Sequence, residues 1–225
     1  MRVVDPDKVI GRQDWGALVP HLLKLEVDPN AATARLRAFT RLLLEWNFGI
    51  SNLISRHDVD RVLDRHIRES VEPGHWLKSS GAKRWMDLGT GGGFPALPLA
   101  LLGVGTSWTL VESRRNKTLF VRKVIQDLAI PGLDVITDRL ENLLGTEHEQ
   151  AYDGFTSRAT MTLGPTLALA REFVKPGGVA FLWKGSQRER EMAENPEWQE
   201  HWSFEGLLGI GSGQSVVARF KRFPI

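Results

Sequence analysis

The stretch WMDLGTGGGFPALPLALLG, residues 85–103, places five glycines and two prolines among residues that otherwise suit a buried core. Glycine loses more conformational entropy on folding than any other residue, so this density indicates a demanding backbone geometry. Gly89, Gly91 and Gly93 alternate in a G-x-G-x-G directly after an apolar run, and Pro95 suits the first turn of a helix. We therefore predict a strand, a tight turn and a helix, with a ligand approaching the main chain of the turn.

Beyond residue 83 short apolar runs alternate with helical patterns, which is typical of an α/β fold. Such alternation implies right-handed crossovers and a mainly parallel, Rossmann-like sheet covered on both faces. No clear helix separates the last two of the seven apolar runs, so we expect an antiparallel hairpin at the sheet edge. The strands are expected at 84–88, 108–112, 134–137, 154–157, 179–183, 203–208 and 215–220, and the helices at 95–102, 116–128, 163–174 and 187–194.

The N-terminal third of the chain has a different pattern. Apolar residues recur at helical spacing over 35–46 and again over 59–71. The segment GHWLKSSGAKR, at 74–84, is a plausible junction before the first strand. We therefore expect an N-terminal helical extension over residues 1–75 and a second domain over residues 76–225.

The residues around the turn narrow the choice of ligand. A dinucleotide fingerprint would have a third glycine where this chain has Phe94, which weakens the interpretation as a nicotinamide-dependent dehydrogenase. Asp87, two residues before the first glycine, suits a ligand that carries positive charge and no pyrophosphate. Glu112 follows the second strand, where an acidic side chain can accept hydrogen bonds from ribose hydroxyls. S-adenosylmethionine has these properties, although both carboxylates are also compatible with simple strand-end caps.

Composition excludes several classes of site. The chain of 225 residues has no cysteine, which removes thiolate nucleophiles, disulfides and thiolate metal sites, and we expect no metal. No apolar run is long enough to span a bilayer, so we expect a cytoplasmic protein without a membrane partner. The net charge is only +2, yet basic residues cluster at one place that suits phosphate, namely Arg114, Arg115, Lys117, Arg122 and Lys123.

Several motifs in order resemble one known family. DLGTGGGFPALPLALL is followed by TLVESRRNKTLFVRKV, DRLEN, DGFTSRA and FLWKG, and LLEWNFGISNLIS and RHIRES precede it. Together they resemble the RsmG (GidB) family of bacterial 16S rRNA guanine-N7 methyltransferases over nearly the whole chain from about residue 35. Ala96 stands in place of a usual glycine, Glu112 in place of a usual aspartate, and Trp183 in place of a smaller apolar residue.

The resemblance implies a Rossmann-like class I fold dependent on S-adenosylmethionine, and it assigns roles to particular positions. Gly89 and Phe94 would line the cofactor at the turn. Leu140 and Glu141, in DRLEN, would flank its adenine. Arg158 would contact the cofactor carboxylate or an RNA phosphate, and Lys184 would help form the acceptor pocket, so both are expected to serve catalysis. His66 and Asn52 match motifs of the family and are cleft-facing candidates without an assigned role, although His66 also suits a structural place in its helix and Asn52 a turn or cap.

The partner implied by the resemblance is 16S rRNA in the small ribosomal subunit or in an assembly intermediate. The acceptor would be N7 of one guanine in the decoding-region loop. The sequence leaves the oligomeric state open, and we favour a monomer. The residues alone leave two other classes open, which are a nicotinamide-dependent oxidoreductase and a non-catalytic RNA-binding or ribosome-binding module.

Overall fold

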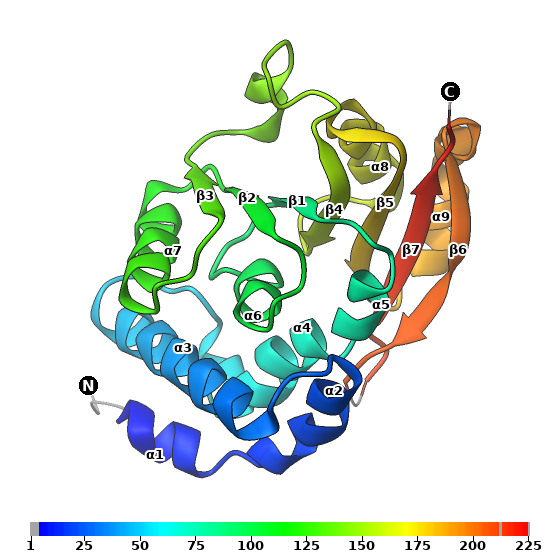
Figure 1. Ribbon diagram of the computed structural model, residues 1–225. Coiled ribbons are helices and arrows are strands. Elements are labelled where there is room, and N and C mark those ends of the chain that lie inside the picture. The colour runs from blue at the N-terminus through cyan, green and yellow to red at the C-terminus, as the bar shows by residue number, and fades with distance from the viewer. Residues whose placement is uncertain (1–4, 212, 225) are drawn as a thin grey trace.

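The computed structural model describes residues 5–211 and 213–224, and a seven-stranded sheet lies at its centre (Figure 1). The strands follow the order β3-β2-β1-β4-β5-β7-β6. β1 to β5 pair in parallel, whereas β7 is antiparallel to both β5 and β6, so the expected Rossmann-like sheet and its edge hairpin are confirmed. Their bounds are β1 Arg84–Leu88, β2 Ser107–Val111, β3 Leu133–Ile136, β4 Tyr152–Arg158, β5 Val174–Lys184, β6 Trp202–Gly209 and β7 Val216–Arg222.

Successive side chains of each strand point to opposite faces of the sheet, and both faces are buried. Trp85 of β1 and Phe181 of β5 lie in one apolar core, while their neighbours Met86 and Leu182 lie in another on the opposite face. A parallel sheet requires this double burial, which explains why β5 is apolar at every position from Val179 to Trp183.

Helices on the two faces follow the crossovers of the chain. On the first face lie α6 Ala96–Leu101 and α7 Arg115–Asp127, whereas α8 Leu163–Phe173 covers the second. α7 buries Phe120 and Val124, which are four residues apart and so share one side of the helix. α9 Arg188–Glu194 differs, because none of its residues is buried.

The N-terminal helices pack onto the first face, at the bottom of the view in Figure 1. The longest, α3, begins after Asp28, whose carboxylate accepts a hydrogen bond from the Ala31 amide, and it buries Phe39 against Phe94 and Phe120. α5 spans the junction expected at residue 75, and one core contains residues from both sides of it, so the division into two domains stays a prediction. The helices of this part are α1 Pro6–Gly11, α2 Val19–Lys24, α3 Pro29–Gly49, α4 Glu69–Val71 and α5 Gly74–Lys78, with a 3₁₀ helix at Trp15–Leu18.

The helical pattern over 59–71 has a more irregular outcome than a single helix. It divides into a 3₁₀ helix at Arg56–Arg61, a π-helix at Leu63–Arg68 and α4. π-helical turns are rare and often occur at functional sites, because the wider turn redirects side chains and carbonyl groups. We therefore expect this segment of the N-terminal extension to contact a functional site.

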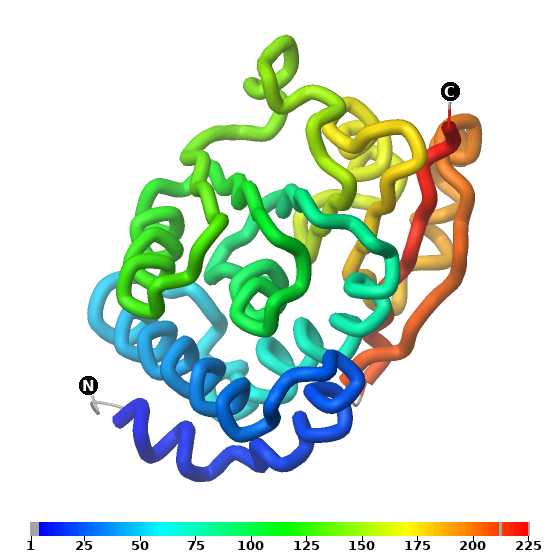
Figure 2. The backbone as a smooth tube through the Cα atoms, viewed as in Figure 1, coloured from blue at the N-terminus to red at the C-terminus, as the bar shows by residue number. Residues whose placement is uncertain are grey.

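Two connections complete the fold. Residues 137–151, which join β3 to β4, project at the top of the molecule in Figure 2 and contain the 3₁₀ helix Leu140–Leu143. A further 3₁₀ helix, Pro196–Glu200, precedes β6. Within residues 5–211 and 213–224, no helix has both the length and the apolar character needed to cross a membrane.

Candidate active site

The glycine turn lies where the strand order reverses, between β1 and its two neighbours β2 and β4. In open α/β sheets this switch point, beyond the carboxyl ends of the strands, is the usual place for a ligand. Gly89, Gly91 and Gly93 have φ angles of +68°, +57° and +87°, which residues with a side chain rarely adopt. The predicted strand, turn and helix are confirmed.

The three glycines serve different purposes. A Cβ atom on Gly93 would lie 2.2 Å from Leu97 Cδ1, so this glycine lets α6 pack tightly. A Cβ atom on Gly89 would lie 2.3 Å from Thr160 Cγ2, in the loop after β4. A Cβ atom on Gly91 would lie 3.7 Å from the Gly89 carbonyl oxygen and 3.8 Å from Lys117 Nζ, which are ordinary contact distances. Gly91 is therefore the turn glycine that a Cβ atom would crowd least, and its left-handed φ angle is what favours glycine there.

Asp87 is completely buried at the end of β1. Its Oδ1 accepts a hydrogen bond of 2.6 Å from the Thr156 hydroxyl, while its Oδ2 is buried without a hydrogen-bond partner among the described residues. Burial raises the pKa of Asp87 to about 7, although the hydrogen bond from Thr156 acts in the opposite direction. A buried carboxylate oxygen without a partner is costly, and a cationic group at this place would stabilise it.

Glu112 follows β2 and holds the glycine turn. Its Oε2 accepts a hydrogen bond of 3.2 Å from the Gly91 amide, and its Oε1 accepts one of 2.9 Å from the Arg114 amide. The Lys117 ammonium lies 3.7 Å from Oε2. The carboxylate therefore links the turn to the start of α7, in addition to any contact with a ribose.

The other residues expected near a cofactor take different places. Phe94 is buried, and its ring packs 5.4 Å from that of Phe39 and 5.0 Å from that of His66, so its side chain supports the turn as part of the core. Leu140 is also buried, at the start of the 3₁₀ helix after β3, whereas Glu141 is exposed. Only the main chain of this short helix is a plausible contact for an adenine.

Arg158 ends β4, where the sequence places it. Its Nη2 donates to Glu69 Oε2 at 3.0 Å and to the carbonyl oxygen of Arg65, while its Nη1 is buried without a partner in the described part of the chain. The guanidinium also lies 5.9 Å from the centre of the Phe94 ring, within the range of a cation–π interaction. Arg158 is thus held firmly on one side and unsatisfied on the other.

Lys184 ends β5 but is already paired. Its ammonium donates to Glu191 Oε2 and to the carbonyl oxygen of Met161, both at 2.8 Å. The same Glu191 oxygen accepts the Leu163 amide at 2.9 Å, so this contact joins α9 to the start of α8. Lys184 therefore shapes the wall of the site through an ion pair in this structure.

A pocket of about 540 Å³ lies at the ends of β4 and β5. It contains Arg158 and Lys184, together with Thr160, which touches the glycine turn at Gly89. Arg65 and Glu69 of the N-terminal segment also line it. Both belong to RHIRES, one of the motifs of the resemblance, but their contact with Arg158 could not be predicted, because they lie about ninety positions from it in the chain.

His66 lies at this pocket, whereas Asn52 is exposed in the loop after α3. Burial, followed by the charge of Arg158, lowers the pKa of His66 to about 3, so the ring is neutral at physiological pH. The structural asparagine of this region is Asn47, whose side-chain oxygen accepts the amides of Leu53 and Ile54.

The turn and its two carboxylates fit S-adenosylmethionine. The left-handed glycines form a turn without Cβ atoms at the switch point, and the Asp87 oxygen without a partner among the described residues suits a cationic ligand. Among the residues of 5–211 and 213–224, no group of three or more histidine, aspartate or glutamate side chains is arranged to hold a metal ion.

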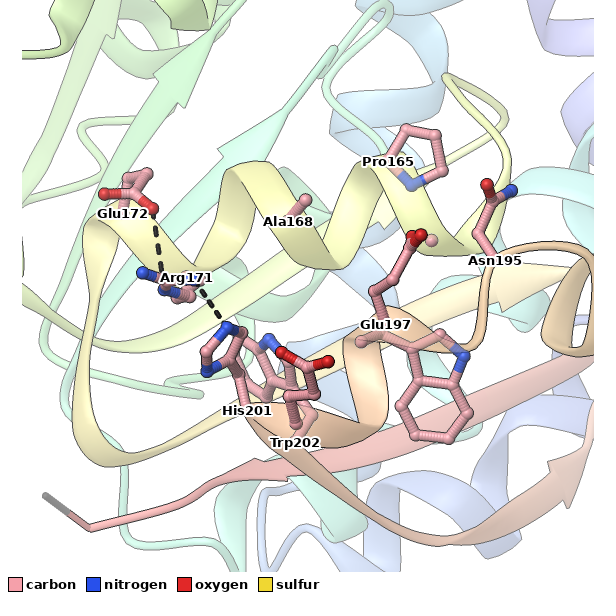
Figure 3. A pocket seen from close by; sticks show the side chains of 11 residues that line it. Pro165, Ala168, Arg171, Glu172, Asn195, Glu197, His201 and Trp202 are labelled. Carbon is pink, nitrogen blue, oxygen red and sulfur yellow. Dashed lines mark hydrogen bonds and ion pairs between the residues drawn. The ribbon is translucent and has the colours of Figure 1, made fainter.

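A second pocket, of about 350 Å³, lies between α8 and the segment before β6 (Figure 3). Arg171 forms a hydrogen bond of 2.6 Å with His201 and an ion pair with Glu172, and these side chains lie along one wall in Figure 3. This second pocket contains none of the residues that the sequence assigns to the site. We therefore locate the candidate active site at the glycine turn and the pocket beside it.

The strand order and the glycine turn at the switch point define the Rossmann-like fold that solved SAM-dependent methyltransferases have. The solved structures agree on the fold. A SAM-dependent methyltransferase from Aquifex aeolicus has a TM-score of 0.52 at 15% identity, with 72% of this chain and 96% of that chain covered. An rRNA methylase from Streptococcus thermophilus has a TM-score of 0.51 at 15% identity, covering 69% and 97%.

Sequence comparison then identifies the family. Residues 32–207 match the family GidB, described as rRNA small subunit methyltransferase G, and the chain belongs to it. The ribosomal RNA small subunit methyltransferase G 1 of Syntrophobacter fumaroxidans is 38% identical, with 73% of this chain and 74% of that protein covered. The methyltransferase G of Rhodopseudomonas palustris is 32% identical, covering 87% and 86%. The family resemblance seen in the motifs is confirmed.

Proposed function

We propose that this protein transfers a methyl group from S-adenosylmethionine to N7 of one guanine in the decoding-region loop of small-subunit 16S rRNA. Membership of the rRNA small subunit methyltransferase G family supports the substrate class. The observation that carries the proposal is the contact between Thr160, which lines the pocket at β4 and β5, and Gly89 of the cofactor turn. This contact makes the two halves of the site neighbours, as methyl transfer requires.

The chemistry at guanine N7 asks mainly for positioning. N7 carries an exposed lone pair, so no proton has to be removed before attack, and bound S-adenosylmethionine supplies an activated methyl group on its sulfonium. The neutral His66 agrees with this requirement, because a pKa of about 3 makes the ring a poor general base. Holding the base and excluding water are then the main tasks of the pocket.

We assign roles to the expected residues accordingly. Asp87 and the main chain at Gly89, Gly91 and Gly93 bind the cofactor, and Glu112 shapes the turn and faces the ribose. The main chain at Leu140 and Glu141 flanks the adenine, with Phe94 beneath the turn. Arg158 lies closest to a catalytic role, because its unsatisfied Nη1 belongs to a side chain that lines the pocket. Lys184 forms the opposite wall through its pair with Glu191.

RNA binding would use cations that the fold leaves uncommitted. Arg122 donates to the Val135 carbonyl and Lys123 pairs with Asp127, so these two members of the basic cluster serve α7 itself. Arg114 and Arg115 are exposed at the start of α7, and the Arg114 amide donates a hydrogen bond to Glu112. We propose that they contact phosphate, that the partner is the small subunit or an assembly intermediate, and that the protein works as a cytoplasmic monomer.

The proposal can be tested with small subunits from a strain that lacks the enzyme. Purified protein and labelled S-adenosylmethionine should transfer label to one guanine of 16S rRNA. N7 methylation makes the base cationic and its glycosidic bond labile, so borohydride reduction and aniline should cleave the RNA at that guanine. Label on a pyrimidine, label on an exocyclic amine, or no label on any RNA would overturn the assignment.

A further inference from the structure

Glu69 is the carboxylate around which the pocket is assembled. Only about 5% of its surface is exposed, and its two oxygens face two different arginines. Oε1 accepts from Arg65 at 2.5 Å, and Oε2 accepts from Arg158 at 3.0 Å. The main-chain oxygen of Glu69 also accepts the Trp183 indole N–H at 2.8 Å. Glu69 thus joins the π-helical segment to the ends of β4 and β5.

The other half of the Arg158 anchor comes from the same segment. The carbonyl oxygen of Arg65, within the π-helix Leu63–Arg68, accepts a second hydrogen bond from Nη2 of Arg158. A carboxylate and a carbonyl on one nitrogen fix the plane of the guanidinium, because both bonds must keep good geometry. Nη1 then has one orientation and, among the described residues, no partner.

A role in stability alone does not explain the ion pair between Glu69 and Arg158. Burying charged groups is costly, and a pair that leaves one guanidinium nitrogen unsatisfied recovers only part of that cost. Arg158 lines the pocket, so a fixed guanidinium gives a bound ligand a positive charge at a constant place. The arrangement is therefore better suited to holding Arg158 in one position at the pocket than to stabilising the fold.

We propose that Glu69 is a positioning residue for methyl transfer, which acts through Arg158 by holding its guanidinium in one position at the pocket where the acceptor RNA would bind. The inference rests on the proposed function for its substrate and deepens it by adding a residue of the N-terminal extension to the site. It assigns to that extension a share in orienting the acceptor. Cofactor binding at the glycine turn does not depend on Glu69.

Glu69→Gln tests this with little change in volume. We expect kcat on small subunits to fall at least tenfold, with the Kd for S-adenosylmethionine unchanged. Glu72→Gln is the matched control, because Glu72 lies three residues further on, pairs with Arg68, accepts the Gly211 amide and does not line the pocket. This control should retain the activity of the parent protein.

A double-mutant cycle separates positioning from a structural role. In an Arg158→Ala background, Glu69→Gln should cause little further loss, because the residue through which it acts is gone. An equal loss in both backgrounds, or parental activity in Glu69→Gln, would overturn the proposal. If Glu69→Gln does not fold, Glu69→Asp repeats the cycle, since its shorter side chain withdraws from Arg158 but keeps the charge.

The failure of the proposed function gives a different signature. Absence of transfer by the parent protein would remove the assigned reaction and leave the anchor itself measurable. Arginine-selective NMR then reports on the Arg158 guanidinium, whose slow rotation in the parent protein should become fast in Glu69→Gln and stay slow in Glu72→Gln. Unchanged rotation in Glu69→Gln would reject the anchoring role independently of any substrate.

Discussion

The two halves of the site are built in different ways. At the ends of β1 and β2 the proposed cofactor half is made mainly of backbone, with three glycines in left-handed conformations and Glu112 accepting the amide of Gly91. At the ends of β4 and β5 the acceptor half is made of side chains, which come from the N-terminal extension, two strands and α9. Most of the first half comes from the short glycine turn, whereas the second half joins segments far apart in the chain.

This difference has a consequence for specificity. A backbone cradle suits a ligand that never varies, because its shape depends on φ and ψ angles alone. A wall of paired side chains can change with the acceptor while the sheet stays the same, as fold and function are separable in general. We therefore expect variants of the turn to affect cofactor affinity, and variants of the pocket wall to leave cofactor affinity unchanged.

The largest effect should follow from Gly91→Val. The branched side chain would crowd the turn and force a strained φ angle, at a cost of about 1–3 kcal/mol for the strain alone. We expect S-adenosylmethionine affinity to fall at least a hundredfold by isothermal titration. Gly145→Val is the matched control, because Gly145 also has a positive φ angle, of +77°. Gly145 lies in the projecting loop, and no described atom would lie within 4 Å of a Cβ atom there. A folded Gly91→Val protein with parental affinity would contradict the cradle.

Asp87 should give the cofactor half a distinctive pH dependence. Its pKa is about 7 in the folded protein and about 4 in an unfolded chain, so the folded state holds the extra proton between these values. Asp87 stabilises the fold fully below pH 4, and that contribution is lost as the pH rises to 7. The free energy of unfolding of Asp87→Asn, relative to the parent, should therefore increase from pH 4 to pH 7 and level off above.

Urea unfolding of both proteins at several pH values measures this difference. Thr156→Val sharpens it, because loss of the hydrogen bond to Oδ1 should raise the pKa of Asp87 further and extend the slope to higher pH. A difference between Asp87→Asn and the parent that does not vary with pH would show that Asp87 stays ionised in the folded protein.

On the acceptor half, Lys184→Met should remove the link between β5 and α9. We expect a loss of about 2 kcal/mol in the free energy of unfolding, since Glu191 would remain without its charged donor. Hydrogen exchange should accelerate over residues 188–194, while cofactor affinity stays parental. Glu191→Gln, which keeps an acceptor for the Leu163 amide, should cost less. A marked fall in cofactor affinity would show that the two halves are not independent.

The smallest effect concerns RNA outside the pocket. Charge reversal at Arg114 and Arg115 should lower the salt dependence of binding to small subunits by about 0.7 in log–log slope for each lost phosphate contact. Reversal of Lys83 and Lys175, at the amino ends of β1 and β5, changes the net charge equally and is the control. Equal slopes for the two double variants would place the RNA surface elsewhere.

Sequence reasoning succeeded for features that depend on residues close together in the chain, and it failed for contacts between distant residues. The turn, the strand ends and the sheet were predictable because each depends on neighbours in the chain, such as the glycines that follow the apolar run of β1. The same logic placed Arg158 and Lys184 at strand ends, where they lie. Periodicity over 59–71 also indicated a helix, but it gave no sign of the π-helical turn that directs Arg65 toward Arg158.

Partners distant in the chain explain what remained hidden. Glu69 is a polar residue on a helical pattern, which usually means a solvated face, and only the fold brings it to Arg158. Lys184 was expected in the acceptor pocket, but its pair with Glu191 could not be seen without the position of α9. Phe94 was expected at the cofactor, and its ring belongs to the core because α3 and His66 pack on it.

The position of β7 affects the order in which the protein can mature during synthesis. Although its residues 216–222 leave the ribosome after those of β6, β7 lies inside the sheet and separates β5 from β6. Until those residues emerge, the strand that ends in Lys184 has one open edge, which is a natural site for wrong pairing. A growing chain can therefore form its glycine turn early, whereas the edge of β5 beside the acceptor wall is covered only after residues 216–222 have emerged.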